Sequence, residues 1–340
     1  MNHRERVDAA LRRETPDRVP VCELVISRQF AERLLGWPVP PRAPGSYEDA
    51  PFTADDAKAV AAALGHDNIC FALKAPVYAD TTVEPDGRIA FGEGHIRTAA
   101  DLAMISLPDP HDDALYAGAA AFAAQKGDYS AWFVTRVGIF STWLSMGLEN
   151  FAVALFDDLP LVERLLDRYV DWAAVVIERA CRLGFDVVAT LDDIAFKTAP
   201  FFSPQVFRDL VMPRYERIGK IVTLPWVMHS DGNVMPILED LLSLGLSGLH
   251  PIEKGAMDIH RMKRDYGGRV CLLGNVDLNI LGIGTPDEVD AEVRGLIRDI
   301  APGGGYIVTS GNSLASYCKP ENVLALSRAV QTYGRYPVAV

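Results

Sequence analysis

The sequence predicts a single (β/α)8 barrel spanning residues 1–340, with an N-terminal helical extension and a small β-hairpin inserted after the second strand. Of the 340 residues, 49% are hydrophobic, which supplies ample apolar material for a large core. Eight short apolar runs lack polar alternation, as strands buried on both faces do. Amphipathic stretches separate most of these runs, which is the order of elements in a parallel barrel.

The predicted strands are rich in Val, Ile, Leu and aromatic residues. They cover residues 19–25, 67–73, 129–137, 186–193, 224–232, 246–253, 269–277 and 305–313. The hairpin is predicted over 81–92, where an Asp-Gly turn joins two alternating runs. A doubly wound open sheet is the alternative. It would show a Gly-rich phosphate turn after an early strand, and the sequence has none there.

The predicted helices keep apolar residues at three- and four-residue spacing. They cover residues 157–184, 203–221, 233–245, 285–304 and 319–334. Ser203 and Thr285 stand at cap positions, and each is followed by a proline. The glycines at 303–305 either cradle a phosphate or turn the chain into the eighth strand; the absence of a following Lys-Ser/Thr favours the turn. The Pro-rich residues 37–52 are predicted to form a surface loop.

The composition excludes several classes of protein. With 33 Lys and Arg against 45 Asp and Glu, the net charge is −12, which disfavours nucleic acid or an anionic membrane as a partner but allows a local site for a small anion. Five cysteines without CxxC spacing argue against a disulfide framework or a zinc ribbon. The N-terminus has no apolar signal core, so a cytoplasmic location is expected. The expected partner is a small-molecule substrate.

Polar residues follow the predicted strands where each strand ends, which is where barrels of this kind place their active sites. From this ring we predict four catalytic residues: Lys74, Arg136, Asp193 and Asp231. We predict five substrate-binding residues: Arg28, Asn275, Asp277, Ser310 and Asn312. Glu23, Ser27, Asp192 and His250 belong to the same ring. A ring of polar groups at eight matching positions is difficult to explain by packing alone.

The sharpest element of the ring is His229-Ser230-Asp231-Gly232. His229 and Asp231 are two residues apart on a strand and therefore project to the same side. Glu253 ends the next strand, about 4.8 Å away. This set of His229, Asp231 and Glu253 suits Zn²⁺ or another divalent ion with an open coordination position. The alternative is structural: His229 hydrogen-bonds Asp231 or Asp193 and holds a loop.

Two other groups allow two interpretations each. Asp192 and Asp193 either supply a general base, whose pKa is raised by the neighbouring carboxylate, or one of them caps the segment that follows. Arg136 and Lys74 either bind a substrate carboxylate or neutralise the acidic ring. The residues alone leave these alternatives open.

Several motifs, in order and at matching spacing, resemble the uroporphyrinogen decarboxylase superfamily in its methyltransferase-like branch. They are RERVDAALRRETPDRVPV (4–21), the stretch from DDIAFKTAP to MPRY (192–215), HSDGNV (229–234), GLHPIEKGAMDI (248–259), LLGNVD (272–277) and GGGYIVTSGNS (303–313). The resemblance implies a (β/α)8 barrel and one of two chemistries. One branch decarboxylates the acetate side chains of a tetrapyrrole without a cofactor. The other moves methyl groups between small molecules and a cobalamin, with zinc activating the substrate.

The decarboxylase branch is similar to a pattern with Arg-Gln-x-Gly-Arg after the first strand and an essential Asp after the second. Here Arg28 and Gln29 fit the first pattern, but its glycine is missing and Arg33 is displaced by one position. Lys74 lies in the stretch where the Asp belongs. These departures, a cation in place of an anion among them, argue against decarboxylation of the octa-acid tetrapyrrole.

The methyltransferase branch that uses coenzyme M is similar to a pattern with His-x-Cys-Gly at the fifth strand, a Glu on the sixth and a Cys after the eighth. This chain keeps His229 and Glu253 but has Asp231 in place of the first Cys. Ser310-Gly311-Asn312-Ser313 replaces the second, and Cys318 lies farther along. Oxygen ligands make the ion a harder Lewis acid, which suits an ether, alcohol or amine better than a thiol.

Three functions therefore compete. The first is a corrinoid-linked methyltransferase that demethylates a methoxylated or N-methylated small molecule, with zinc on the chain and cobalamin on a partner corrinoid protein. The second is a cofactor-free decarboxylase of a tetrapyrrole or a smaller carboxylic acid. The third is a non-catalytic barrel that binds a tetrapyrrole or a corrinoid partner.

Overall fold

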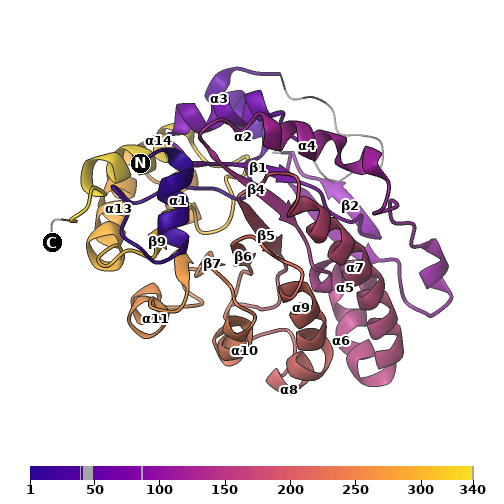
Figure 1. Cartoon of the computed structure of the whole chain (residues 1–340). Helices are drawn as coiled ribbons and strands as arrows, with labels where there is room; N and C mark the ends of the chain where they lie inside the picture. Colours follow the sequence, from indigo (N-terminus) through magenta and orange to yellow (C-terminus); the bar gives the residue numbers. More distant parts are fainter. Residues whose placement is uncertain (39, 41–48, 86, 339–340) are drawn as a thin grey trace.

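The computed structural model describes residues 1–38, 40, 49–85 and 87–338, and seven parallel strands curl side by side within it (Figure 1). In spatial order they are β1 (Asn68–Ala72), β4 (Ser130–Thr135), β5 (Val187–Leu191), β6 (Trp226–His229), β7 (Gly248–His250), β8 (Cys271–Leu273) and β9 (Tyr306–Ile307). Helices surround this sheet, which confirms a TIM-barrel-like α/β fold. The surface loop predicted at 37–52 falls partly on residues 39 and 41–48, which lie outside the described residues.

The first predicted strand, 19–25, joins the two ends of this sheet but forms isolated bridges and not a regular strand. Val21 bridges Val308 beyond β9, and its carbonyl accepts the backbone N–H of Asp67, just before β1, at 2.7 Å. Pro20 has no backbone N–H to give to a ladder. The backbone N–H and C=O of Glu23 bond the side chain of Asn68 at 3.0 and 2.8 Å. This closing segment is therefore held beyond β9 by backbone hydrogen bonds, and beside β1 mainly by the side chains of Asp67 and Asn68.

The remaining elements are helices and one hairpin. The helices are α1 (His3–Leu11), α2 (Arg28–Leu35), α3 (Ala54–Leu64), η1 (Asp101–Met104), η2 (Asp113–Tyr116), α4 (Ala117–Ala124), α5 (Ile139–Met146), α6 (Leu148–Asp157), α7 (Leu159–Ala180), α8 (Pro204–Val206), η3 (Phe207–Val211), α9 (Met212–Gly219), η4 (Met235–Ile237), α10 (Leu238–Ser243), α11 (Ile259–Tyr266), α12 (Leu278–Ile283), α13 (Pro286–Ile300) and α14 (Pro320–Tyr333). The predicted hairpin is confirmed, because β2 (Ala79–Val83) pairs antiparallel with β3 (Ile89–Gly94).

The helix predicted over 203–221 is broken into three pieces. Ser203 caps α8 as expected, with its Oγ accepting the N–H of Val206 at 3.2 Å. The chain then passes through a π-helical turn, η3, before α9 begins. Pro213 lies in the first turn of α9 and cannot donate the helical hydrogen bond to the preceding turn, which accounts for the wider turn before it.

The interior of the barrel is apolar, and α1 closes it at the amino ends of the strands. Val7 and Leu11 of α1 pack in one buried cluster with Trp132, Val134 and Val227, which lie on β4 and β6. The backbone N–H of Arg4 donates to Asp128, just before β4, so α1 covers the amino ends of the strands. The carboxyl ends remain open for a site.

The three glycines at 303–305 form the turn into β9. All three have positive φ, at +82°, +78° and +66°. A Cβ on Gly304 would lie 2.3 Å from the carbonyl oxygen of Glu14, so only glycine fits there. The turn interpretation is therefore confirmed.

Two further expectations concern cysteine and membrane segments. All five cysteines are free, and Cys22, Cys271 and Cys318 are buried as small hydrophobic residues. Among the described residues no single helix is long and apolar enough to cross a membrane. Helices α5 and α6 meet that test only as a pair, and they are bent by 100°.

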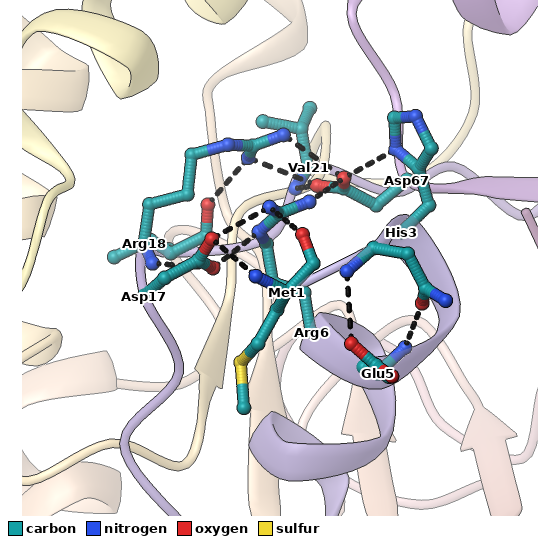
Figure 2. Close-up of polar contacts among 10 residues, drawn as sticks. Met1, His3, Glu5, Arg6, Asp17, Arg18, Val21 and Asp67 are labelled. Atoms are coloured by element: carbon teal, nitrogen blue, oxygen red, sulfur yellow. Dashed lines mark hydrogen bonds and ion pairs between the residues drawn. The ribbon is translucent and has the colours of Figure 1, made fainter. Parts of the chain in front are cut away.

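A buried carboxylate ties α1 to the closing segment and to β1 (Figure 2). Asp67 is completely buried and accepts hydrogen bonds from Arg6 at 2.7 Å, Arg18 at 2.9 Å and the backbone of Val21 at 3.0 Å. Burial raises the pKa of Asp67, but His3, Arg18, the Val21 N–H and Arg6 together bring it below its ordinary value. The carboxylate is thus held ionised in the interior.

We predict that Asp67→Asn lowers the free energy of unfolding by about 3–5 kcal/mol, because it leaves Arg6 and Arg18 without their buried partner. Asp17→Asn is the matched control. Asp17 also bonds Arg6, but its side chain is 43% exposed, so the loss should stay near 1 kcal/mol or below. Urea denaturation measures both. Equal losses in the two variants would show that Asp67 does not hold the closure.

Candidate functional site

The carboxyl ends of β5 and β6 bring Asp193, His229 and Asp231 together. Their potential ligand atoms all lie within 4.8 Å of one another. The Nε2 atom of His229 is 3.5 Å from Oδ1 of Asp193 and 3.8 Å from Oδ1 of Asp231. These separations are longer than normal hydrogen bonds. The three donors therefore surround a common point without bonding one another through His229.

The other side of the His229 ring contacts His250. The strand register pairs His229 on β6 with His250 on β7, and their Nδ1 atoms are 2.6 Å apart. His250 is completely buried, and burial, followed by the charge of His229, lowers its pKa well below the ordinary value. His229 is thus held between a buried neutral ring and two carboxylates.

Asp231 is fixed by its neighbours but keeps one unused oxygen. Its backbone N–H donates to Oδ1 of Asp193 at 3.0 Å, and its Oδ2 accepts the amide of Asn312. Its Oδ1 is buried and has no hydrogen-bond partner among the described residues. Burial raises the pKa of Asp231 to about 7; the charges of Asp193 and Glu253 add to this, while His229 and Asn312 oppose it.

Glu253 lies beside this group and not inside it. Its Oε2 accepts the backbone N–H of Gly232 at 2.7 Å, and its Oε1 is 3.7 Å from the ammonium of Lys197. Gly232 has φ +86°, and a Cβ there would lie 2.5 Å from the carbonyl oxygen of Ala195. The glycine therefore lets the loop after β6 pass close to the loop after β5 and presents its N–H to Glu253.

Adjacent aspartates at the end of β5 have different surroundings. Asp192 is completely buried, and its carboxylate accepts backbone N–H groups of Val137 at 2.6 Å, Gly138 at 3.2 Å and Phe140 at 3.2 Å. It therefore anchors the start of α5. Asp193 faces His229, and its carbonyl accepts the indole N–H of Trp143 at 3.0 Å. Of the two interpretations of the pair, Asp192 has the capping role, although the helix it caps is α5 and not the segment after β5.

A cavity of about 720 Å³ opens between the closing segment, α3, β1 and the tip of the hairpin. Its walls are largely apolar and include Leu24, Ile26, Phe52, Val60, Ile69 and Leu73. Polar groups reach it from Glu23, Arg28 and Lys74. This size and balance of surface suit a small, mostly apolar molecule with a few polar groups.

Glu23 connects the cavity to the cluster. Both of its carboxylate oxygens accept from Ser310, one from the backbone N–H at 2.6 Å and one from the hydroxyl at 2.9 Å. Burial raises the pKa of Glu23 to about 8, against the effect of these two bonds. Two residues beyond Ser310, Asn312 bonds Asp231. A chain of hydrogen bonds through Ser310 and Asn312 therefore links the cavity wall at Glu23 to Asp231 of the cluster.

The other predicted site residues lie around this centre. The guanidinium of Arg28 donates to the carbonyls of Ala50 and Pro51 and stacks 3.8 Å over the ring of Phe52. Lys74 lies half-buried in the cavity wall. The guanidinium of Arg136 is buried 4.4 Å over the ring of Phe140.

Two predicted substrate-binding residues make structural bonds. The Asn275 amide donates to the carbonyl of Ile252 at 2.7 Å. Asp277 caps α12 through the N–H of Asn279 at 2.8 Å. The structure thus brings His229, Asp231 and Asn312 together and places Ser310 on Glu23. Asn275 and Asp277 are bound to neighbouring backbone.

Two residues of the site have roles that the sequence did not indicate. Asp193 was predicted to be a catalytic residue and not a metal ligand. The signal for the ligand role was its position at the end of the strand next to that of His229. His250 was placed only in the ring of polar residues at the strand ends, without a role. The strand register could have indicated its contact with His229, but only once the ends of both strands were known.

The three donors fit a divalent cation. Imidazole nitrogen and carboxylate oxygens are ordinary Zn²⁺ ligands, and donors about 2.1 Å from a tetrahedral ion lie about 3.4 Å apart. The observed 3.5 and 3.8 Å separations are close to this value. The unpartnered Oδ1 of Asp231 is the buried polar atom that such an ion would satisfy.

Comparison with known proteins places the chain in a family. The family model for uroporphyrinogen decarboxylase (URO-D) matches residues 2–333, so the chain belongs to this family. The uroporphyrinogen decarboxylase of Alkalilimnicola ehrlichii is 24% identical over 292 residues, which are 76% of each chain. That of Dechloromonas aromatica is 32% identical over 197 residues, 56% of this chain and 54% of the relative.

A solved structure described as a methyltransferase from Methanosarcina mazei is similar to this chain, with a TM-score of 0.77 and 22% identity. The match covers 98% of this chain and 99% of that one. At this identity the match supports the shared fold. The predicted resemblance to the uroporphyrinogen decarboxylase superfamily is confirmed by the family model.

We predict that Glu23→Gln changes how stability depends on pH. With a pKa near 8 when folded against 4.5 ordinarily, Glu23 binds more protons in the folded than in the unfolded chain between these values. Its contribution to stability is therefore full below about pH 4.5 and is lost as the pH rises through about 8. The variant should gain stability relative to the native chain between about pH 5 and about pH 8.

Urea denaturation at several pH values measures this difference, and Glu14→Gln, at an exposed position, serves as the control. A difference between Glu23→Gln and the native chain that stays constant over the whole range would show that Glu23 is ionised in the folded protein.

Proposed function

We propose that this member of the uroporphyrinogen decarboxylase family is a methyltransferase that removes a methyl group from a methoxylated or N-methylated small molecule. The methyl acceptor would be a corrinoid, supplied by a partner protein. The observation that supports this most directly is the Asp193–His229–Asp231 cluster, with its unpartnered buried oxygen. A cofactor-free decarboxylase does not need such a set of donors.

In this proposal His229, Asp231 and Asp193 hold a zinc ion. Glu253 remains the further candidate donor, since its charge already acts on Asp231. A bound Zn²⁺ supplies Lewis acidity that polarises the heteroatom bearing the methyl group. On transfer the heteroatom would keep the bonding electron pair and take up one proton from solvent. A corrinoid in the Co(I) state would supply the nucleophile that accepts the methyl group.

The chain's own residues position the substrate. The apolar walls of the cavity bind the body of the molecule and exclude water from it. Lys74 lies in the wall of this cavity and suits a carboxylate or another anionic group on the substrate. Arg136, buried over the ring of Phe140 and outside that wall, is the second predicted cation for such a group. Asn312 holds Asp231 in place by its amide, so it contributes through the ligand.

The shape and chemistry of the cavity also bear on the substrate. An octa-acid tetrapyrrole needs many cations, whereas the walls here are mostly apolar. Their cations are Lys74, Arg88 and Arg28, and Arg28 is bound to backbone carbonyls. The likeness to the Methanosarcina mazei methyltransferase along almost the whole chain supports the same choice. A small methylated molecule is the better match to the cavity.

We predict that His229→Ala removes most bound zinc and abolishes cobalamin-dependent methyl loss from methoxyarenes or methylamines. The fold should survive, with a stability change within about 0.5–3 kcal/mol, because one strand-end ring contributes little core area. Glu253→Gln should act in the same direction but more mildly, since it lies at the edge of the cluster. Elemental analysis, a methyl-transfer assay and a thermal melt measure the three quantities.

His111→Ala is the matched control, because His111 is exposed and remote from the cluster in sequence and should leave metal content unchanged. Full zinc occupancy in His229→Ala, or zinc-free native protein prepared in the presence of zinc, would overturn the metal assignment. A lower melting temperature with normal turnover would assign His229 a structural role instead.

The second candidate is a decarboxylase, favoured by the names of the curated relatives and by the cations Arg28 and Lys74 at the cavity. In that case a small carboxylic acid would release CO₂, the rate would not respond to chelators, and Lys74→Met would lower it. CO₂ release measured with and without EDTA therefore separates the two functions.

A further inference from the structure

Residues 49–52, here called the entry segment, lead into α3 and form one wall of the cavity. All four line it. The segment contains no helix or strand, and no backbone–backbone hydrogen bond joins it to any other residue in the described part of the chain. Pro51 has no N–H to donate. The position of this wall therefore depends on side chains.

Arg28, the first residue of α2, contacts every residue of the entry segment. Its Nε atom donates to the carbonyl of Ala50 at 2.9 Å, and its Nη2 atom donates to the carbonyl of Pro51. Its guanidinium carbon lies 3.8 Å from the centre of the Phe52 ring and covers one face of that ring. The backbone N–H of Arg28 donates to Oδ2 of Asp49 at 3.3 Å. One side chain, with its own backbone N–H, thus holds the wall.

The charge of Arg28 is balanced by carboxylates of the protein itself. Its Nη1 atom is 3.7 Å from Oδ2 of Asp56, and Asp56 also accepts the N–H of Thr53 at the start of α3. Burial lowers the pKa of Arg28, and the charges of Asp56 and Asp49 oppose this effect. A buried guanidinium needs such partners, and here the chain supplies them. Arg28 is therefore committed to the wall without an anion from a substrate.

Gln29, the next residue of α2, contacts a second wall of the cavity. Gly87 and Ile89, at the tip of the β2–β3 hairpin, line the cavity together with Gln29. A Cβ on Gly87 would lie 2.8 Å from the side-chain nitrogen of Gln29, so the hairpin tip lies directly against this side chain. The entry segment and the hairpin tip therefore both rest on the first turn of α2.

We propose that Arg28 is a positioning residue that sets the shape of the substrate cavity by holding the entry segment, and that it does not bind the substrate itself. The inference deepens the proposed function, on which the identity of the cavity as the substrate site rests. A wall that is fixed in advance spares a ligand the cost of ordering it. Arg28 thus selects substrates by the shape of their apolar body and not by their charge.

Two ligands that differ in charge but not in shape separate a positioning role from a binding role. A methoxynaphthoate and its neutral amide share one apolar body, and naphthalene fluorescence allows both to be titrated against the full chain. We expect Arg28→Met to weaken both ligands by a similar factor of about 10, since binding must then order a wall that the native chain holds in place. A residue that binds the anion would affect the acid alone.

Two further variants control the comparison. Arg28→Lys keeps the charge but loses the planar fork that reaches two carbonyls at once, so it should also weaken both ligands. It provides the same comparison if Arg28→Met does not fold. Arg33→Met is the matched control, because Arg33 is also on α2 and donates to one carbonyl, that of Cys318 at 2.8 Å, but does not line the cavity. It should leave both affinities unchanged.

Hydrogen–deuterium exchange provides a readout that needs no ligand. We expect faster exchange of the backbone amides of the entry segment and of the first turn of α3 in Arg28→Met, with the rest of the chain unchanged. Arg33→Met should exchange as the native chain does in this region.

A loss of affinity confined to the acid overturns the inference and makes Arg28 a substrate ligand, while the proposed function stands. Unchanged affinities together with unchanged exchange in Arg28→Met also overturn it. If the native chain binds neither ligand, the substrate class of the proposed function is wrong. The exchange measurement then decides the role of Arg28 by itself: faster exchange of the entry segment supports that role, and unchanged exchange refutes it.

Discussion

The closure of the barrel depends on two consecutive side chains, Asp67 and Asn68. They precede and begin β1, and they bond the backbone of the closing segment at Val21 and Glu23. The segment itself contains Pro20 and forms only isolated bridges with the strand on its other side. The buried carboxylate of Asp67, balanced by Arg6 and Arg18, therefore holds this edge together, where neighbouring strands elsewhere in the sheet are joined by regular backbone ladders.

The positions of the polar side chains at the site depend on this closure of the barrel. Because Asn68 fixes the backbone of Glu23, the carboxylate of Glu23 reaches Ser310 beyond β9. Asn312, two residues farther on, reaches across the barrel mouth to Asp231 after β6. One line of polar contacts thus runs from the base of α1 to the proposed metal cluster. A change at the amino end of the barrel can alter the site by displacing this line.

The sequence predicted the features that follow from hydrophobic periodicity and from the Gly, Pro and capping residues at the ends of segments. Apolar runs located the strands, and the polar residues after them located the site, because parallel strands end at one side of a barrel. It could not separate Asp192 from Asp193. Neighbouring residues at a strand end point in opposite directions, and only the register with β4 and β6 shows which one faces α5 and which faces His229. It also expected a regular first strand, which Pro20 and the side chain of Asn68 prevent.

The charges at the cluster explain why oxygen ligands suit this chain. Asp193 and Asp231 lie near one imidazole, with Glu253 beside this group, and the pKa of about 7 at Asp231 reflects burial together with the charges of Asp193 and Glu253. Lys197 is near Glu253 but is itself 69% exposed, so it neutralises little of this charge. A divalent cation would offset this accumulation of negative charge and favour the ionised form of Asp231. Where the resembling coenzyme M branch has a thiolate, Asp231 would leave such a cation harder and more strongly polarising, and that favours cleavage of a bond from methyl to oxygen or nitrogen.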